Sequence, residues 1–148
     1  MKKAKGELIV LLTADNIVND NFVIKVNDYF SKGYDVIIPY SKIINKDNIY
    51  SDFHQNRQDY LYKKNNIIPN WSEGFSISQK IVNNGDLFHI NKSKINGGSD
   101  ITYGGELKKK YSYIHSDTLV MYHIFPDNLS EYRRQQINRG IGFSHTKY

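Results

Sequence analysis

The sequence predicts an α/β fold in which residues 1–148 form one domain with a central mixed, mostly parallel sheet and flanking helices. Residues 7–13 and 34–40 are apolar runs of strand length. Such runs are typical of strands that are buried on both faces, as in a parallel sheet. Between them, apolar residues recur at helical spacing from Phe22 to Phe30. Strand, helix and strand with short connections predict a right-handed crossover unit.

The remaining elements are predicted from helix-capping residues and from residues that end helices and strands. Asn19-Asp20 is expected to cap the first helix and Gly33 to end it. The other expected elements are a helix over 51–63 capped by Ser51, a loop over 65–74, a strand over 86–90, a helix over 100–110, strands over 113–115 and 118–123, and a last helix capped by Asp127-Asn128.

Composition limits the classes of protein. Hydrophobic residues make up 39% of 148 residues, which indicates a globular chain rather than a disordered one. The longest apolar run, Leu8–Leu12, is far shorter than the roughly 18 residues of a membrane span. There is no cysteine, so a bound metal would need carboxylate, imidazole, hydroxyl or carbonyl ligands, which favours Mg²⁺ or Mn²⁺.

The net charge of +5 leaves several ligands open. Basic residues cluster at 108–110 and at Arg133-Arg134, where a solvated helix face is the ordinary interpretation and contact with phosphate or a membrane surface is the alternative. No nucleic-acid recognition motif is present, so nucleic acid is not an expected partner.

Two acidic residues are the first candidates for chemistry. Asp15 follows the first expected strand, at the end where open α/β sheets bind ligands, and its carboxylate could hold a divalent cation. Asp100 follows Gly97-Gly98-Ser99 and could act as a general base. The ordinary interpretation of both residues is a turn or a helix cap.

Three further candidates lie nearer the carboxyl end. His123 ends an apolar strand, where a purely structural histidine is the commoner case. Gln136 and Arg139 are three residues apart and therefore share a helix face, from which an arginine could bind phosphate oxygens.

Taken in order, these segments resemble the inverting, family-two type of GT-A glycosyltransferase. Residues 4–23 look like the stretch in which "a-x-G-E" leads into a strand and an Asp-x-Asp motif. Residues 86–98 resemble the segment before the acidic catalytic pair, with Ser99-Asp100 in the place of that pair. The strand ending at His123 resembles a "v-x-H" strand, and residues 136–140 resemble Gln-x-x-Arg-Trp. The resemblance covers residues 4–142.

The resemblance implies a Rossmann-like fold and a role for each candidate. Asp15 matches the metal-binding aspartate of Asp-x-Asp, and His123 matches a metal ligand of some relatives. Asp100 matches the base that deprotonates the acceptor. Gln136 and Arg139 match a motif that contacts the diphosphate or the acceptor.

The chain also departs from the family pattern. Thr13 stands where the first aspartate of Asp-x-Asp belongs, so we expect it to contact the substrate rather than the metal, and we expect Mn²⁺ or Mg²⁺ to bind more weakly. Ser99 and Gly140 replace a glutamate and a tryptophan. The matched segments correspond to the carboxyl-terminal two-thirds of the family's catalytic domain, and the nucleotide-gripping first half has no counterpart among them.

The expected function is therefore transfer of a sugar, with inversion, from a nucleotide-diphosphate sugar to a hydroxyl group of a glycan, lipid or protein. The alternative is a non-catalytic remnant that acts as a binding or assembly subunit. A separate N-terminal half-domain or a second copy of the chain are its expected partners. The expected location is the cytoplasm, with the cytoplasmic face of the membrane as a second expectation.

Overall fold

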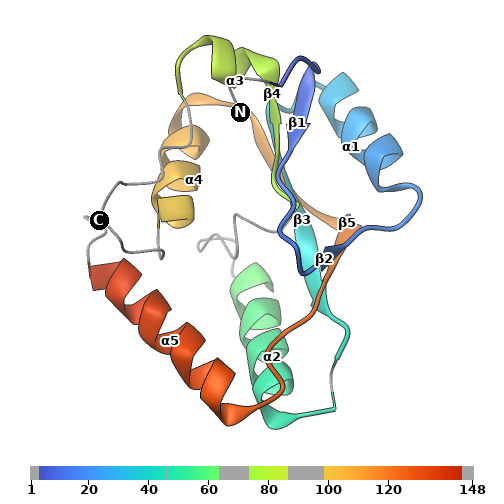
Figure 1. The fold of residues 1–148 in the computed structure, drawn as a ribbon. Coiled ribbons are helices and arrows are strands. Elements are labelled where there is room, and N and C mark those ends of the chain that lie inside the picture. The colour runs from blue at the N-terminus through green and yellow to red at the C-terminus, as the bar shows by residue number, and fades with distance from the viewer. Residues whose placement is uncertain (1–3, 46, 64–73, 87–98, 145–148) are drawn as a thin grey trace.

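A computed structural model describes residues 4–45, 47–63, 74–86 and 99–144. Its elements are β1 (Leu8–Val10), β2 (Asn16–Ile17), α1 (Phe22–Ser31), β3 (Val36–Ile43), α2 (Ile49–Lys63), β4 (Ser76–Ser78), α3 (Gln79–Asn83), α4 (Ser99–Lys110), β5 (Tyr113–His123) and α5 (Leu129–Ser144). The α/β class predicted from the sequence is confirmed, with helices flanking a five-stranded mixed sheet (Figure 1).

The sheet is not mostly parallel, so that part of the prediction is wrong. Its strand order is β1-β4-β3-β5-β2, and only β3 and β5 pair in parallel. The cause is β4, a short strand that the sequence analysis did not predict. It inserts between β1 and β3 and is antiparallel to both. The crossover through α1 therefore joins strands that are not neighbours.

The position of β1 also differs from the prediction. It lies at an edge of the described sheet and has only three residues, of which Ile9 alone is buried. The longer buried strand is β3, which lies in the centre of the sheet and buries all of its residues except Tyr40 and Lys42. Pro39 has no N–H to donate, and the register of β3 against β5 shifts between Pro39 and Tyr40. The two strands expected over 113–123 form the single strand β5.

Two hydrophobic clusters cover the two faces of the sheet. On one face, Phe22 and Val26 of α1 pack against Ile37, Leu119 and Met121. On the other face, Ile81 of α3 and Leu107 of α4 pack with Ile77 and their neighbours. Burial of these side chains stabilises a three-layer arrangement in which the strand ends remain available for a site.

Polar side chains cap α2 and α5, and the capping residue is not always the expected one. Asn48 rather than Ser51 caps α2, because its Oδ1 accepts hydrogen bonds from the N–H groups of Tyr50 and Ser51. Asn128 caps α5 by accepting from the N–H of Glu131, as predicted. The residue before α1 is Asn21, and its side chain makes no capping bond. Gly33, at φ +90°, ends α1.

Some expectations lie outside the described residues, namely nearly all of the loop over 65–74 and of the strand over 86–90. In the part of the chain that is described, no helix has both the length and the apolar composition needed to cross a membrane.

Candidate functional site at the carboxyl ends of the strands

Strand direction brings two distant segments to one end of the sheet. β1, β3 and β5 run in the same direction, so their carboxyl ends meet at one edge (Figure 1). Asp15 lies in the loop after β1, and His123 is the last residue of β5. The two-residue strand β2 fixes their approach, because Asn16 pairs directly with His123. The N–H of Ile124 also donates to the carbonyl oxygen of Asp15, at 3.2 Å.

Asp15 and His123 form a hydrogen-bonded pair. Nε2 of His123 lies 2.8 Å from Oδ2 of Asp15. An ionised carboxylate can only accept a hydrogen bond, so this contact requires that Nε2 carries the proton. The imidazole is 4% exposed and the carboxylate 49% exposed. The histidine is thus held inside the protein, while the aspartate presents part of its surface to solvent.

Thr13 occupies the other oxygen of Asp15. Its hydroxyl donates a hydrogen bond to Oδ1. The backbone around the pair is a closed turn, because the N–H of Asn16 donates to the carbonyl of Thr13 and the N–H of Thr13 donates to Oδ1 of Asn16. Both carboxylate oxygens are therefore oriented before any ligand arrives.

The surroundings of Asp15 favour its ionised form. Partial burial raises the pKa of the carboxyl group, but the hydrogen bonds from Thr13 and His123 and the charge of His123 lower it. The net result is a pKa below the ordinary value of 3.8. Asp15 is therefore a carboxylate at neutral pH, as a cation ligand must be.

A group of aromatic side chains, which the sequence analysis did not single out, holds His123 in place. The ring of Phe125 lies edge-on to His123, with centroids 6.1 Å apart, and stacks on His54 of α2 at 4.2 Å. Asn45 clamps Phe125 by bonding to both its N–H and its carbonyl oxygen. The only signal in the sequence was an aromatic residue two positions beyond the strand-ending histidine.

The other predicted site residues are not joined to this pair by contacts among the described residues. Asp100 lies in the first turn of α4. This end of α4 lies towards the end of the sheet where β1, β3 and β5 finish (Figure 1). Gln136 and Arg139 lie on α5. Gln136 is half-buried, and its amide N–H group lies 3.5 Å from Oε1 of Gln135. The side chains of Asp100 and Arg139 are outside what the structure describes.

The pair fits only part of a metal site. Within the described ranges, no group of three or more histidine or acidic side chains is placed to hold a metal ion. Asp15 and His123 offer one carboxylate and one imidazole. Neighbouring ligands of an octahedral ion, each about 2.1 Å from it, are about 3 Å apart, which is close to the observed 2.8 Å. An ion held here would take the place of the Nε2 proton that now bonds to Asp15, because a ligating imidazole nitrogen carries no proton. The remaining ligands would have to be water or substrate phosphate, which is common for Mg²⁺.

The geometry does not fit a hydrolase triad. In that arrangement the base bonds to the nucleophilic hydroxyl and the carboxylate bonds to the far side of the base. Here the carboxylate of Asp15 stands between the hydroxyl of Thr13 and the imidazole of His123. Thr13 is thus placed as a neighbour of the carboxylate and not as a nucleophile activated by histidine.

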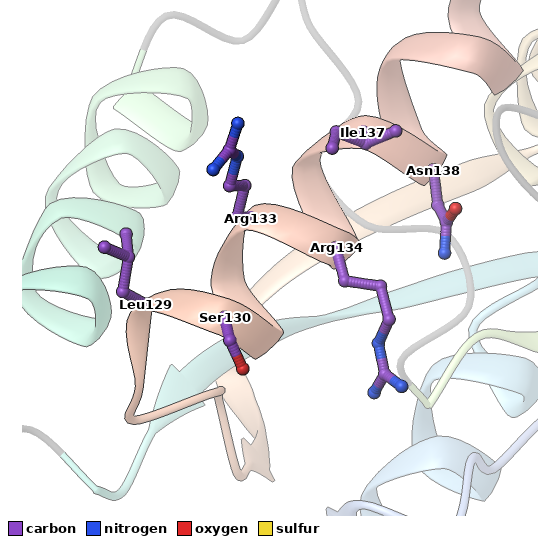
Figure 2. A pocket seen from close by; sticks show the side chains of 6 residues that line it. All are labelled: Leu129, Ser130, Arg133, Arg134, Ile137 and Asn138. Atoms are coloured by element: carbon purple, nitrogen blue, oxygen red, sulfur yellow. The ribbon is translucent and has the colours of Figure 1, made fainter.

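A pocket of about 490 Å³ lies on α5, lined by Leu129, Ser130, Arg133, Arg134, Ile137 and Asn138. Figure 2 shows the side chains of Arg133 and Arg134 leaving the helix in different directions. The two guanidinium groups therefore do not converge on one phosphate. The surface is wide, basic and apolar, and it is formed by a single helix.

Comparison with known proteins adds no identification. No family model matches the chain, and no curated protein matches it significantly.

Proposed function

We propose that this chain is the acceptor-side part of an inverting glycosyltransferase of GT-A type, which transfers a sugar from a nucleotide-diphosphate sugar to a hydroxyl acceptor. The observation that supports the proposal is the contact between Asp15 and His123 at the carboxyl ends of β1 and β5. The two residues are 108 positions apart in the chain, and the family resemblance assigns both of them to one metal site.

Asp15 and His123 are the described residues that would hold a divalent cation such as Mn²⁺. When bound, such an ion offsets the negative charge that develops on a departing diphosphate. The low pKa of Asp15 supports this role, because the carboxylate needs no deprotonation at neutral pH. The hydroxyl of Thr13 donates to the carboxylate of Asp15 and so orients it, and Thr13 would also contact the substrate.

Asp100 is the proposed general base. Its carboxylate takes the proton of the acceptor hydroxyl, whose oxygen forms a bond to the anomeric carbon of the donor sugar. The bond between that carbon and the diphosphate oxygen breaks, and the electron pair leaves with the diphosphate. The first turn of α4 lies towards the same end of the sheet as Asp15, which supports this assignment (Figure 1). Gln136 and Arg139 of α5 would contact the diphosphate.

Transfer assays with Mn²⁺ and UDP-, GDP- and dTDP-sugars would test this function. We expect Asp100→Asn to lower the rate by at least about 100-fold, because removal of a general base typically has an effect of that size. Asp20→Asn is a matched control, since Asp20 is an exposed aspartate of the described chain. Equal rates for wild type and Asp100→Asn would remove Asp100 from the mechanism.

A second candidate function is a non-catalytic subunit that completes its sheet with another polypeptide. Its supporting observation is the edge strand β1, which pairs with β4 on one side and with no described strand on the other. Such an edge can accept a further strand. Co-expression with an N-terminal half-domain of the same family would test it, and failure to co-purify would exclude that partner.

A further inference from the structure

The helix α2 is amphipathic in the opposite sense to an ordinary surface helix. The residues that it buries are polar, namely Ser51, His54, Gln55 and Gln58. They are bonded inside the protein: Oε1 of Gln55 accepts from the N–H of Ile43 at 2.7 Å, and the amide of Gln58 donates to Nε2 of His54 at 3.0 Å. These hydrogen bonds show that the polar face of α2 is the face that packs against the rest of the protein.

The outer face of α2 carries the large apolar side chains. Ile49 is 75% exposed, Phe53 58% and Tyr60 56%. With the exposed Asn56, their spacing of four, three and four residues is that of the contact positions between two paired helices. An exposed stripe of this kind on a soluble domain indicates an interaction surface.

Two charged residues of opposite sign flank the stripe, and their positions favour a second copy of this chain as the partner. Asp52 and Arg57 are both exposed, lie on opposite sides of the stripe, and form no ion pair with a described residue. In two parallel helices packed along such a stripe, a residue on one flank faces the residue five positions later on the partner's other flank. Asp52 of one copy would thus meet Arg57 of the other, on both sides of a two-fold axis.

We propose that α2 is a self-association surface, through which two copies of this chain pair with their α2 helices parallel. Antiparallel pairing would instead place the acidic flank of one copy beside the acidic flank of the other, with Asp52 near Asp52 of the second copy. An anionic membrane is a poorer occupant, because the charges along the stripe are of both signs: Asp52 and Asp59 lie on one flank, Arg57 lies on the other, and Lys63 lies at the carboxyl end. The surface is one helix of 15 residues, so we expect a dissociation constant in roughly the micromolar range.

Sedimentation velocity across about 5–200 µM, a range that brackets micromolar affinity, tests the pairing. Wild type should dimerise and Phe53→Asp should be monomeric. Val23→Asp, which changes an equally exposed apolar residue on α1, should dimerise like wild type. Circular dichroism checks that each variant is folded. A wild type that stays monomeric, or a dimer that Phe53→Asp leaves intact, would overturn the proposal.

Charge reversal tests the orientation. Asp52→Arg and Arg57→Asp should each weaken the dimer about tenfold, and the double variant should recover wild-type affinity because the pair is restored with reversed sign. The chain has no cysteine, so Asn56→Cys gives a single thiol on the stripe. In a parallel pair it faces its own copy and should form a disulfide-linked dimer on mild oxidation. A dimer without recovery or cross-linking would rule out the parallel arrangement.

Discussion

The imidazole of His123 lies 2.8 Å from the carboxylate of Asp15, and only the carboxylate is substantially exposed. The contact links two segments at one end of the sheet, namely the loop after β1 and the last residue of β5. The same two side chains would be the ligands in the proposed cation site. Stability and the proposed cation binding would therefore depend on one pair, and the two roles can be separated by experiment.

Asp15→Asn should make the protein slightly less stable at neutral pH. The pKa of Asp15 is lowered in the folded state, so its contribution is present above the unfolded pKa and is lost as pH falls through the folded value. The carboxylate is half exposed, which limits the effect to about 1 kcal/mol at most. Urea unfolding at pH 7 and pH 3 measures it, and the difference between wild type and variant should shrink at pH 3. A variant as stable as wild type at pH 7 would show that the pair contributes nothing.

Gly74→Ala should destabilise the fold strongly. Gly74 has φ +70°, and a Cβ atom would lie 2.3 Å from Cε of Met121 and 2.9 Å from Cγ of Pro39. The left-handed backbone costs about 1–2 kcal/mol and the overpacking about 1–3 kcal/mol more. Gly85→Ala is the matched control, because Gly85 has φ +79° and nothing within 4 Å of the added atom. Equal losses for the two variants, measured by denaturant unfolding, would contradict the clash.

Local features of this fold are more predictable from the sequence than contacts between distant segments. The helices α1, α2, α4 and α5 follow from apolar spacing and from caps such as Asn128, which act within one turn. β4 was missed because Ser76-Ile-Ser78 has only one apolar residue, and its insertion between β1 and β3 depends on pairing across the fold. That insertion is why the expectation of a mostly parallel sheet was wrong.

The same limit applies to the site. That Asp15 and His123 each end a strand segment was readable from the sequence, and the family resemblance linked them. Their contact depends on the pairing of Asn16 in β2 with His123. A strand of only two residues has no alternation of apolar and polar side chains, so the sequence gives no sign of this pairing. The polar inner face of α2 was also unpredictable, because Gln55 and Gln58 look like surface residues until their partners on other elements are known.

Asn45→Ala should loosen the support of His123. Its side chain bonds to both backbone groups of Phe125, and removal leaves an N–H and a carbonyl without those partners. We expect a loss of about 1–3 kcal/mol in the free energy of unfolding. Asn27→Ala on α1 is a control, since the side chain of Asn27 is exposed. A loss no greater than that of the control would show that the clamp is dispensable.

His115 should make the protein acid-sensitive. Burial, with a smaller effect from the charge of Lys108, lowers the pKa of His115 to about 4. Below the ordinary value of 6.5 the unfolded chain then takes up more protons than the folded one, so stability falls from about pH 6.5 down to about pH 4. The loss should be on the order of 3 kcal/mol. His115→Gln should flatten this part of the curve of unfolding free energy against pH, and an unchanged slope would exclude His115 as its source.

Mn²⁺ binding is the most direct test of the pair as a ligand set. The two donors alone should bind the ion weakly, with a dissociation constant near millimolar, and addition of a nucleoside diphosphate should tighten binding because phosphate oxygens complete the coordination. Electron paramagnetic resonance of free Mn²⁺ gives both values without any turnover. Asp15→Asn and His123→Ala should each abolish the tightening, whereas Asp20→Asn should preserve it. If the two site variants bind as wild type does, the ion is held elsewhere, and the contact between Asp15 and His123 serves the fold alone.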